Sequence, residues 1–218
     1  MFRYSRIIIS WLLCCAIAAF CPFAFAEKKK PPRIGYQLKP DQQAVIEDPK
    51  IISAEQNCEN WTWAAALDSL LKAKGSAMGQ EYQILRLYGG TLCTGVKSYS
   101  ELADKVSHEY VLDDGRRFLL QALYTSGPPV HIDPLVVAMR EQRPLMVIWK
   151  SHSYVLIGVN YDEYIGPNNA RILELKVLKL ADPATGGSVS FVRGRDDSQE
   201  INGMMDVRVT SLQLYQMR

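Results

Sequence analysis

Hydrophobic residues recur at helical spacing through the first half of the chain. In the stretch QNCENWTWAAALDSLL (residues 56–71), apolar side chains repeat three and four positions apart from Trp63 onward. This pattern predicts a buried helix over roughly residues 61–73, which Gly75 ends. Similar patterns predict further helices over residues 80–87, 99–106, 116–124 and 133–141.

After Pro144 the hydrophobic period changes from helical to strand-like. A Gly-Pro-Asn-Asn turn at residues 166–169 separates two of the strands. The expected strands cover residues 145–149, 154–161, 171–180, 188–192 and 207–214. The chain is therefore expected to be α+β, with a helical half over about 51–143 and an antiparallel half over about 144–218. Residues 27–50, which are rich in Lys and Pro, are expected to form an extended N-terminal arm.

The first 26 residues have the pattern of a secretory signal peptide of bacterial type. Two arginines precede an apolar run over residues 7–20, and Ala24-Phe25-Ala26 predicts cleavage before Glu27. The apolar run is too short for a good membrane span, so we expect no stable membrane anchor after cleavage. The sequence thus predicts an exported protein, either periplasmic or extracellular.

Charge and cysteine content narrow the functional classes. The predicted leader holds two of the 25 basic residues, which leaves 23 basic against 23 acidic residues and gives no electrostatic argument for nucleic-acid binding. Only Cys58 and Cys93 remain after cleavage, an even pair in an oxidising compartment. Two Cys and three scattered His do not form a zinc-site pattern, and no metal or cofactor is expected.

The start of the first predicted helix carries candidate chemistry. Asn60 and Thr62 can both cap this helix, and the free N–H groups there favour a developing negative charge. The segment reads NWTWAA and has Gln56 six residues before Thr62. This arrangement resembles papain-like cysteine peptidases, including the bacteriocin-processing type, whose bacterial members often read NWCWAA. The resemblance implies a two-lobe fold and places Thr62 where the family has its nucleophilic Cys.

Three other positions match the family's order. Gln56 corresponds to the glutamine that helps form the oxyanion hole, although it also reads as an ordinary surface residue. His152 heads the apolar strand that follows residues 143–147, where the family carries its general base. Asp182, in an Asp-Pro pair, corresponds to the residue that orients the imidazole, and it also suits a turn. His108 and His131 have no such setting and are interpreted as surface or loop residues.

A threonine at the nucleophile position argues against peptidase activity. A thiol has a pKa near neutrality and is readily held as a thiolate, whereas a hydroxyl is far less acidic. Threonine nucleophiles are typical of a chain N-terminus, where a free amine is the base, and Thr62 is internal. We therefore interpret Thr62 as a helix cap.

The resemblance also bears on the cysteines. Papain has a half-cystine between its Gln and its nucleophile, which together with the export signal predicts a Cys58–Cys93 disulfide. The alternative is that Cys58, if unpaired, is a relocated nucleophile that acts with His152 and Asp182.

Three functional hypotheses follow. The first is a secreted pseudopeptidase that binds a peptide or protein partner in the cleft between the lobes, with Trp61, Trp149 and Tyr154 as apolar walls. The second is an active thiol hydrolase or transferase that uses Cys58. The third is a hydroxyl enzyme that uses Thr62.

Overall fold

The computed structural model describes residues 35–112 and 114–212, which belong to one compact unit. The predicted leader and the first residues of the expected arm lie outside the described residues. The helices are α1 (Pro49–Ile52), α2 (Thr62–Lys72), α3 (Gln80–Tyr88), α4 (Tyr99–Val106) and α5 (Asp133–Arg140). The strands are β1 (Gln37–Val45), β2 (Glu109–Val111), β3 (Arg117–Ser126), β4 (Leu145–Trp149), β5 (His152–Ile165), β6 (Arg171–Ala181), β7 (Ser188–Val192) and β8 (Ile201–Leu212).

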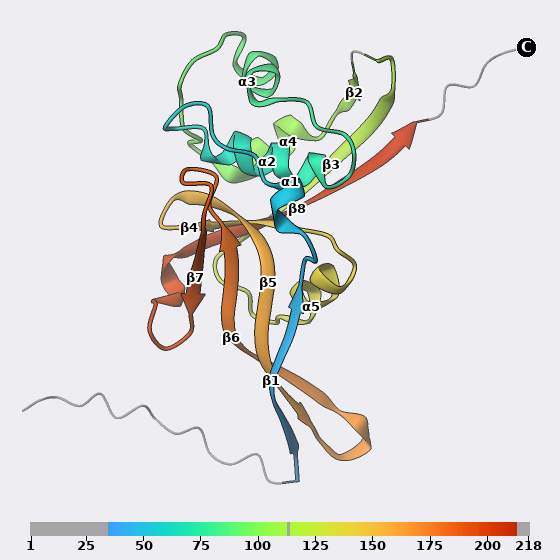
Figure 1. The fold of residues 1–218 in the computed structure, drawn as a ribbon, viewed down its shortest axis with the longest axis vertical. Coiled ribbons are helices and arrows are strands. Elements are labelled where there is room, and N and C mark those ends of the chain that lie inside the picture. The colour runs from blue at the N-terminus through green and yellow to red at the C-terminus, as the bar shows by residue number, and fades with distance from the viewer. Residues whose placement is uncertain (1–34, 113, 213–218) are drawn as a thin grey trace, which may run out of the picture. The chain divides into compact units, whose positions relative to one another are not determined.

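The strands of the described part form one antiparallel sheet. Its order is β2-β3-β8-β4-β5-β6-β7, and β1 pairs with the outer part of β5 beyond the end of β4. Figure 1 shows α2, α3 and α4 grouped with β2 and β3, while α5 lies beside β1 and β5. The fold is therefore α+β, as the sequence predicts.

Strand β4 is buried on both faces, and this position organises the core. Met146 and Ile148 pack into a cluster with α2, α3 and α4, whereas Val147 and Trp149 pack into a second cluster with α5, β6 and β7. Because side chains alternate along a strand, β4 contributes to both clusters at once. This explains its uninterrupted apolar sequence, which is typical of strands covered on two sides.

One predicted helix is wrong. Residues 116–124 were expected to be helical, but Arg117–Ser126 is strand β3, which pairs with β8 along its whole length. Phe118 and Leu120 are both buried and two residues apart, which is a strand period, while Leu119, Ala122 and Leu123 have the spacing of a helix. The helical half at 51–143 thus also contains β2 and β3. Within the expected arm at 27–50, the described residues form strand β1 and the start of α1 at Pro49.

The α2–α4 cluster also contains a buried phenol, on Tyr110 in β2. Its ring stacks on Phe118 with 5.4 Å between centroids, and its hydroxyl donates a hydrogen bond to the Val106 carbonyl oxygen over 3.0 Å. Burial raises the pKa of Tyr110 from 10.0 to about 12. The unfolded chain therefore loses this proton at lower pH than the folded chain does.

We expect Tyr110→Phe to flatten the alkaline loss of stability. Since the unfolded phenol ionises near pH 10 and the folded one near 12, the wild-type free energy of unfolding should fall as pH rises through this interval. The variant should lose about 1 kcal/mol at pH 7, from the missing hydrogen bond, but decline less steeply above pH 10. Urea unfolding at pH 7, 10 and 11.5 checks this, and parallel slopes for the two proteins would contradict it.

Candidate functional site

A tight hairpin presents His152 at the start of β5. Trp149 and His152 pair across a two-residue turn formed by Lys150 and Ser151, whose φ angles are 53° and 62°. Positive φ at both central residues is typical of the type I′ hairpin turn, which matches the right-handed twist of the flanking strands. The imidazole therefore projects from the end of a strand whose register is fixed by β4.

His152 pairs with Asp182. The imidazole Nε2 lies 2.9 Å from the Asp182 Oδ1 atom. The carboxylate is 9% exposed and is oriented by the turn that follows β6, where Oδ1 accepts from the Ala184 N–H over 2.9 Å and Oδ2 from the Thr185 hydroxyl over 3.2 Å. A carboxylate can only accept, which assigns the proton to Nε2 and leaves Nδ1 as the free ring nitrogen.

Thr62 lies on the other side of the hairpin, as the first residue of α2. It is 8% exposed, and its Oγ1 accepts a hydrogen bond from the Ser153 backbone N–H over 3.3 Å. No hydrogen bond joins Thr62 to the imidazole among the described residues. The hydroxyl therefore connects the helix to the strand that carries His152.

The capping prediction for Asn60 and Thr62 is wrong. Trp61 is the N-cap residue of α2, and no side chain caps it. Thr62 is already helical, and its hydroxyl is used by Ser153. The Asn60 side chain donates instead to the Cys93 carbonyl oxygen over 3.4 Å.

A polar cavity of about 290 Å³ brings Thr62 and His152 together. It is lined by Glu59, Asn60, Thr62, Trp63, Gly95, Val96, Tyr99, Lys150, Ser151 and His152. Asp182 lines another hollow, of about 280 Å³, together with Lys50, Glu55 and Gly186. The two members of the His152–Asp182 pair thus border different hollows.

Gln56 lies on the Asp182 side of the pair. Its backbone N–H donates to the Pro183 carbonyl oxygen over 2.9 Å. Its side-chain Oε1 is buried and has no hydrogen-bond partner among the described residues. Gln56 does not line the cavity shared by Thr62 and His152. Its contribution to an oxyanion hole therefore stays a prediction.

None of the aromatic residues expected to wall a cleft lines this cavity. Trp61 and Trp149 are both buried in hydrophobic clusters, and neither lines the cavity. Tyr154 packs on the imidazole, with 4.4 Å between its ring centroid and that of His152. Trp63, by contrast, is almost fully buried and still contributes to the cavity wall. Apolar content alone does not distinguish a tryptophan that lines a site from one in the core.

Tyrosine hydroxyls near the site are neutral donors or acceptors. The Tyr99 hydroxyl lies 2.7 Å from the Ser153 Oγ atom, and burial raises the Tyr99 pKa above its ordinary value of 10.0. Burial, followed by the charge of Asp182, raises the pKa of Tyr154. Neither phenol is therefore available as a base near neutral pH.

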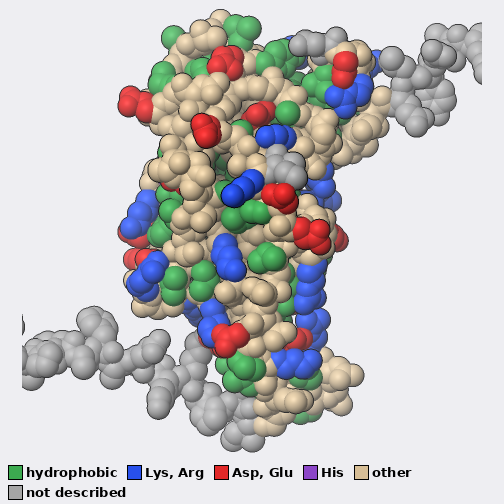
Figure 2. All heavy atoms as spheres, viewed as in Figure 1, with side chains coloured by type: hydrophobic (Ala, Val, Ile, Leu, Met, Phe, Trp, Pro, Cys, Tyr) green, Lys and Arg blue, Asp and Glu red, His purple; other side chains and the backbone are tan. Residues whose placement is uncertain are grey.

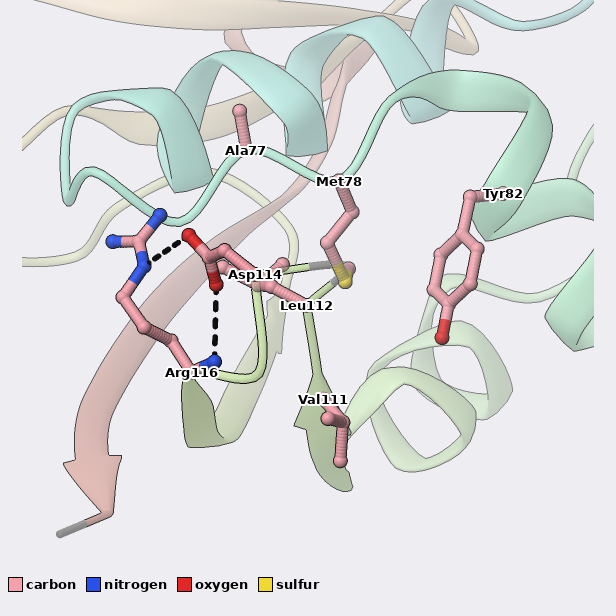
Figure 3. A pocket seen from close by; sticks show the side chains of 7 residues that line it. All are labelled: Ala77, Met78, Tyr82, Val111, Leu112, Asp114 and Arg116. Carbon is pink, nitrogen blue, oxygen red and sulfur yellow. Dashed lines mark hydrogen bonds and ion pairs between the residues drawn. The ribbon is translucent and has the colours of Figure 1, made fainter.

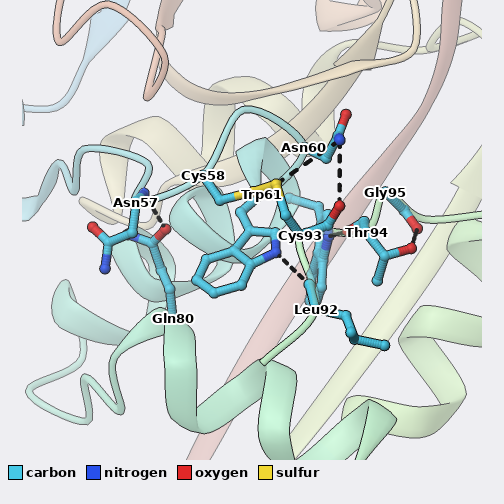
Figure 4. The surroundings of a disulfide bond; sticks show 10 residues. Asn57, Cys58, Asn60, Trp61, Gln80, Leu92, Cys93, Thr94 and Gly95 are labelled. Carbon is cyan, nitrogen blue, oxygen red and sulfur yellow. Dashed lines mark hydrogen bonds between the residues drawn. A yellow bond between two sulfur atoms is a disulfide. The ribbon is translucent and has the colours of Figure 1, made fainter. Parts of the chain in front are cut away.

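Cys58 and Cys93 are joined by a disulfide, with 5.9 Å between their Cα atoms. Figure 4 shows Asn60 and Trp61 turned towards the segment that carries Cys93. The Trp61 indole N–H donates to the Leu92 carbonyl oxygen over 3.0 Å. These contacts connect the segment before α2 to the segment that supplies Gly95 to the cavity. The bond is consistent with export to an oxidising compartment.

Several residues at the site have no signal in the sequence. Ser153 and Tyr99 are 54 positions apart, and Thr62 and Ser153 are 91 apart, so only the fold reveals their contacts. The two histidines interpreted as surface residues, His108 and His131, are indeed exposed.

Other surfaces carry less chemistry. A cavity of about 250 Å³ lies between α3 and the β2–β3 hairpin. Figure 3 shows that Asp114 and Arg116 of its lining pair with each other, with Tyr82 opposite. Acidic and basic side chains are interspersed over the face shown in Figure 2. Across residues 35–112 and 114–212, no cluster of His, Cys, Asp and Glu suits a metal ion. The helices of this same part are all too short or too polar to cross a bilayer.

No protein-family model matches the chain, and no curated protein matches it. An interpretation of the site therefore depends on its own geometry and on the motif residues of the sequence.

We expect the double substitution Cys58→Ser with Cys93→Ser to lower the free energy of unfolding by about 3 kcal/mol, because a loop of this length then becomes unconstrained in the unfolded state. Urea unfolding of the variant beside the oxidised wild type measures the difference. A similar loss should appear in wild type treated with reductant. Equal urea midpoints for all three samples would contradict a stabilising role of the bond.

Proposed function

We propose that the chain is a papain-like pseudopeptidase that binds an extended peptide segment at the cavity between Thr62 and His152. One observation carries the proposal. A hydroxyl stands at the head of α2, beside an imidazole that is held by a carboxylate, where cysteine peptidases need sulfur. The proposal includes a two-lobe arrangement, with α2–α4 on one side of the site and the β5–β7 sheet on the other.

The contacts of Thr62 argue against catalysis by its hydroxyl. General-base catalysis needs the nucleophile within hydrogen-bond reach of the base. Among the described residues the Thr62 hydroxyl forms no hydrogen bond with His152, and it is nearly buried while it accepts from the Ser153 N–H. The His152–Asp182 pair is left with no acidic group to deprotonate at this position. In this proposal the pair serves as a polar wall that a bound peptide contacts through Nδ1.

The disulfide argues against Cys58 as a nucleophile. Its sulfur is bonded to Cys93, and Cys58 is not among the cavity-lining residues. An enzyme using Cys58 would need this bond reduced and His152 redirected. Binding without turnover requires neither change, and it suits an exported protein.

The surroundings of the site favour an extended ligand. His152 borders one hollow and Asp182 another, so a chain lying over the pair would contact both. Glu59 and Lys150 supply opposite charges at the first hollow, and Lys50 and Glu55 do so at the second. Peptide backbones offer the matching donors and acceptors.

We expect Thr62→Cys to create a reactive thiolate. If His152 is aligned as in a cysteine peptidase, iodoacetamide should alkylate the new thiol well below pH 8, whereas an ordinary thiol has a pKa near about 8.5. His152→Ala added to this variant should return the alkylation to an ordinary thiol profile. His131→Ala, which removes an exposed histidine, is the matched control. An ordinary profile for Thr62→Cys alone would overturn the papain-like assignment.

The same reagents test catalysis by the wild-type protein. Neither iodoacetamide nor a fluorophosphonate probe should leave an adduct on the unreduced wild type. Modification of Cys58 that is lost in His152→Ala would favour the thiol enzyme, and an adduct on Thr62 would favour the hydroxyl enzyme.

Peptide binding is tested by filling the cavity. Gly95 lines it, and a Cβ there would meet no atom within 4 Å, so Gly95→Phe should fold and obstruct the site. Gly90→Phe is the matched control, because Gly90 has equal space and does not line the cavity. Peptides selected on wild type from a displayed library should bind Gly90→Phe normally and Gly95→Phe at least tenfold more weakly. Equal binding to both variants would contradict the proposed site.

A further inference from the structure

The turn that presents His152 is built from residues that its backbone shape disfavours. Lys150 and Ser151 both have left-handed φ angles. Type I′ turns strongly prefer Asn-Gly at these positions, because side chains other than Asn and Asp crowd the backbone there. Strain of this kind persists only where surrounding contacts maintain it, and it is concentrated at functional sites.

The contacts that hold this turn come from the start of β8. The Lys150 N–H donates to the Glu200 carbonyl oxygen over 2.9 Å, and the Ser151 N–H donates to the Asn202 Oδ1 atom over 2.8 Å. The Lys150 and Glu200 side chains also form an ion pair at 3.2 Å. Of these two N–H acceptors, only that of Asn202 is a side-chain atom. A single substitution at Asn202 therefore removes this hydrogen bond.

Asn202 is itself held in place. Its carbonyl oxygen accepts from the Tyr124 hydroxyl over 2.8 Å and from the Gly127 N–H over 2.8 Å. The Tyr124 ring covers the next residue, Gly203, where a Cβ would lie 2.5 Å from the ring. The contacts with Tyr124 of β3 and with Gly127 therefore hold the backbone segment from which the Asn202 side chain extends.

The two residues that flank His152 thus donate their backbone N–H groups to acceptors that are distant in the sequence. Ser151 gives its N–H to Asn202, and Ser153 gives its N–H to Thr62. We infer that Asn202 is a positioning residue for His152. It keeps the turn in its strained shape and thereby aims the imidazole at the head of α2. This inference rests on the proposed function, since it assigns Asn202 to the same site.

The test uses the thiol introduced by Thr62→Cys as a reporter of imidazole position. In this background, Asn202→Ala should make alkylation at pH 6 roughly fivefold slower, the size expected for one neutral hydrogen bond, and should move the pH profile towards that of an ordinary thiol. Asn202→Asp keeps an acceptor at the same place and should retain the profile. Its added charge would favour the imidazolium, so it cannot imitate the loss.

A second variant separates positioning from general destabilisation. Ser151→Gly places at the turn a residue that adopts positive φ at little cost, so it should restore the profile lost in Asn202→Ala. An unchanged profile in Asn202→Ala would overturn the inference, as would a loss that Ser151→Gly fails to restore. An ordinary profile in Thr62→Cys itself would instead reject the proposed function, which keeps the two failures distinct.

Discussion

The structure depends on a short strand that is covered on both faces. Met146 and Ile148 of β4 belong to one hydrophobic cluster, and Val147 and Trp149 belong to the other. Strand β4 therefore contributes side chains both to the cluster around α2 and to the cluster around β6 and β7. The candidate site depends on β4, because the turn after β4 leads directly to His152, and β5 then runs beside the start of α2.

Most of the secondary structure is predictable from the sequence, because the spacing of the apolar residues and the Gly and Pro residues between segments indicate the same elements. Strands β4 and β7 begin and end where the pattern expects, and α4 does as well. Strands β1 and β2 are not predicted, and the segment of β3 is predicted to be a helix. The apolar residues of β3 have spacings that suit both a helix and a strand. Its pairing with β8 makes this segment a strand. That pairing joins residues that are 77 (Ser126 and Gly203) to 95 (Arg117 and Leu212) positions apart, so no local window contains both strands.

The candidate site is only partly predictable. Motif order leads to Thr62, His152 and Asp182, and the fold brings them to a common place. The use of the Thr62 hydroxyl by Ser153 is not predictable, because a threonine at a helix start reads as a cap in any sequence. Asn202 is missed for a similar reason. Asn202 lies in a strand, belongs to no motif and is exposed. Only its hydrogen bond with Ser151 indicates a role.

The hydrogen bond from Ser153 to Thr62 restricts the side chains that suit position 62. A hydroxyl oxygen accepts a hydrogen bond from an N–H well, whereas a thiol sulfur accepts it weakly. A cysteine at position 62 would offer the Ser153 N–H only a weak acceptor, directly after His152 in the chain. The contact therefore makes the anchoring of β5 at Ser153 depend on a single oxygen atom at the head of α2.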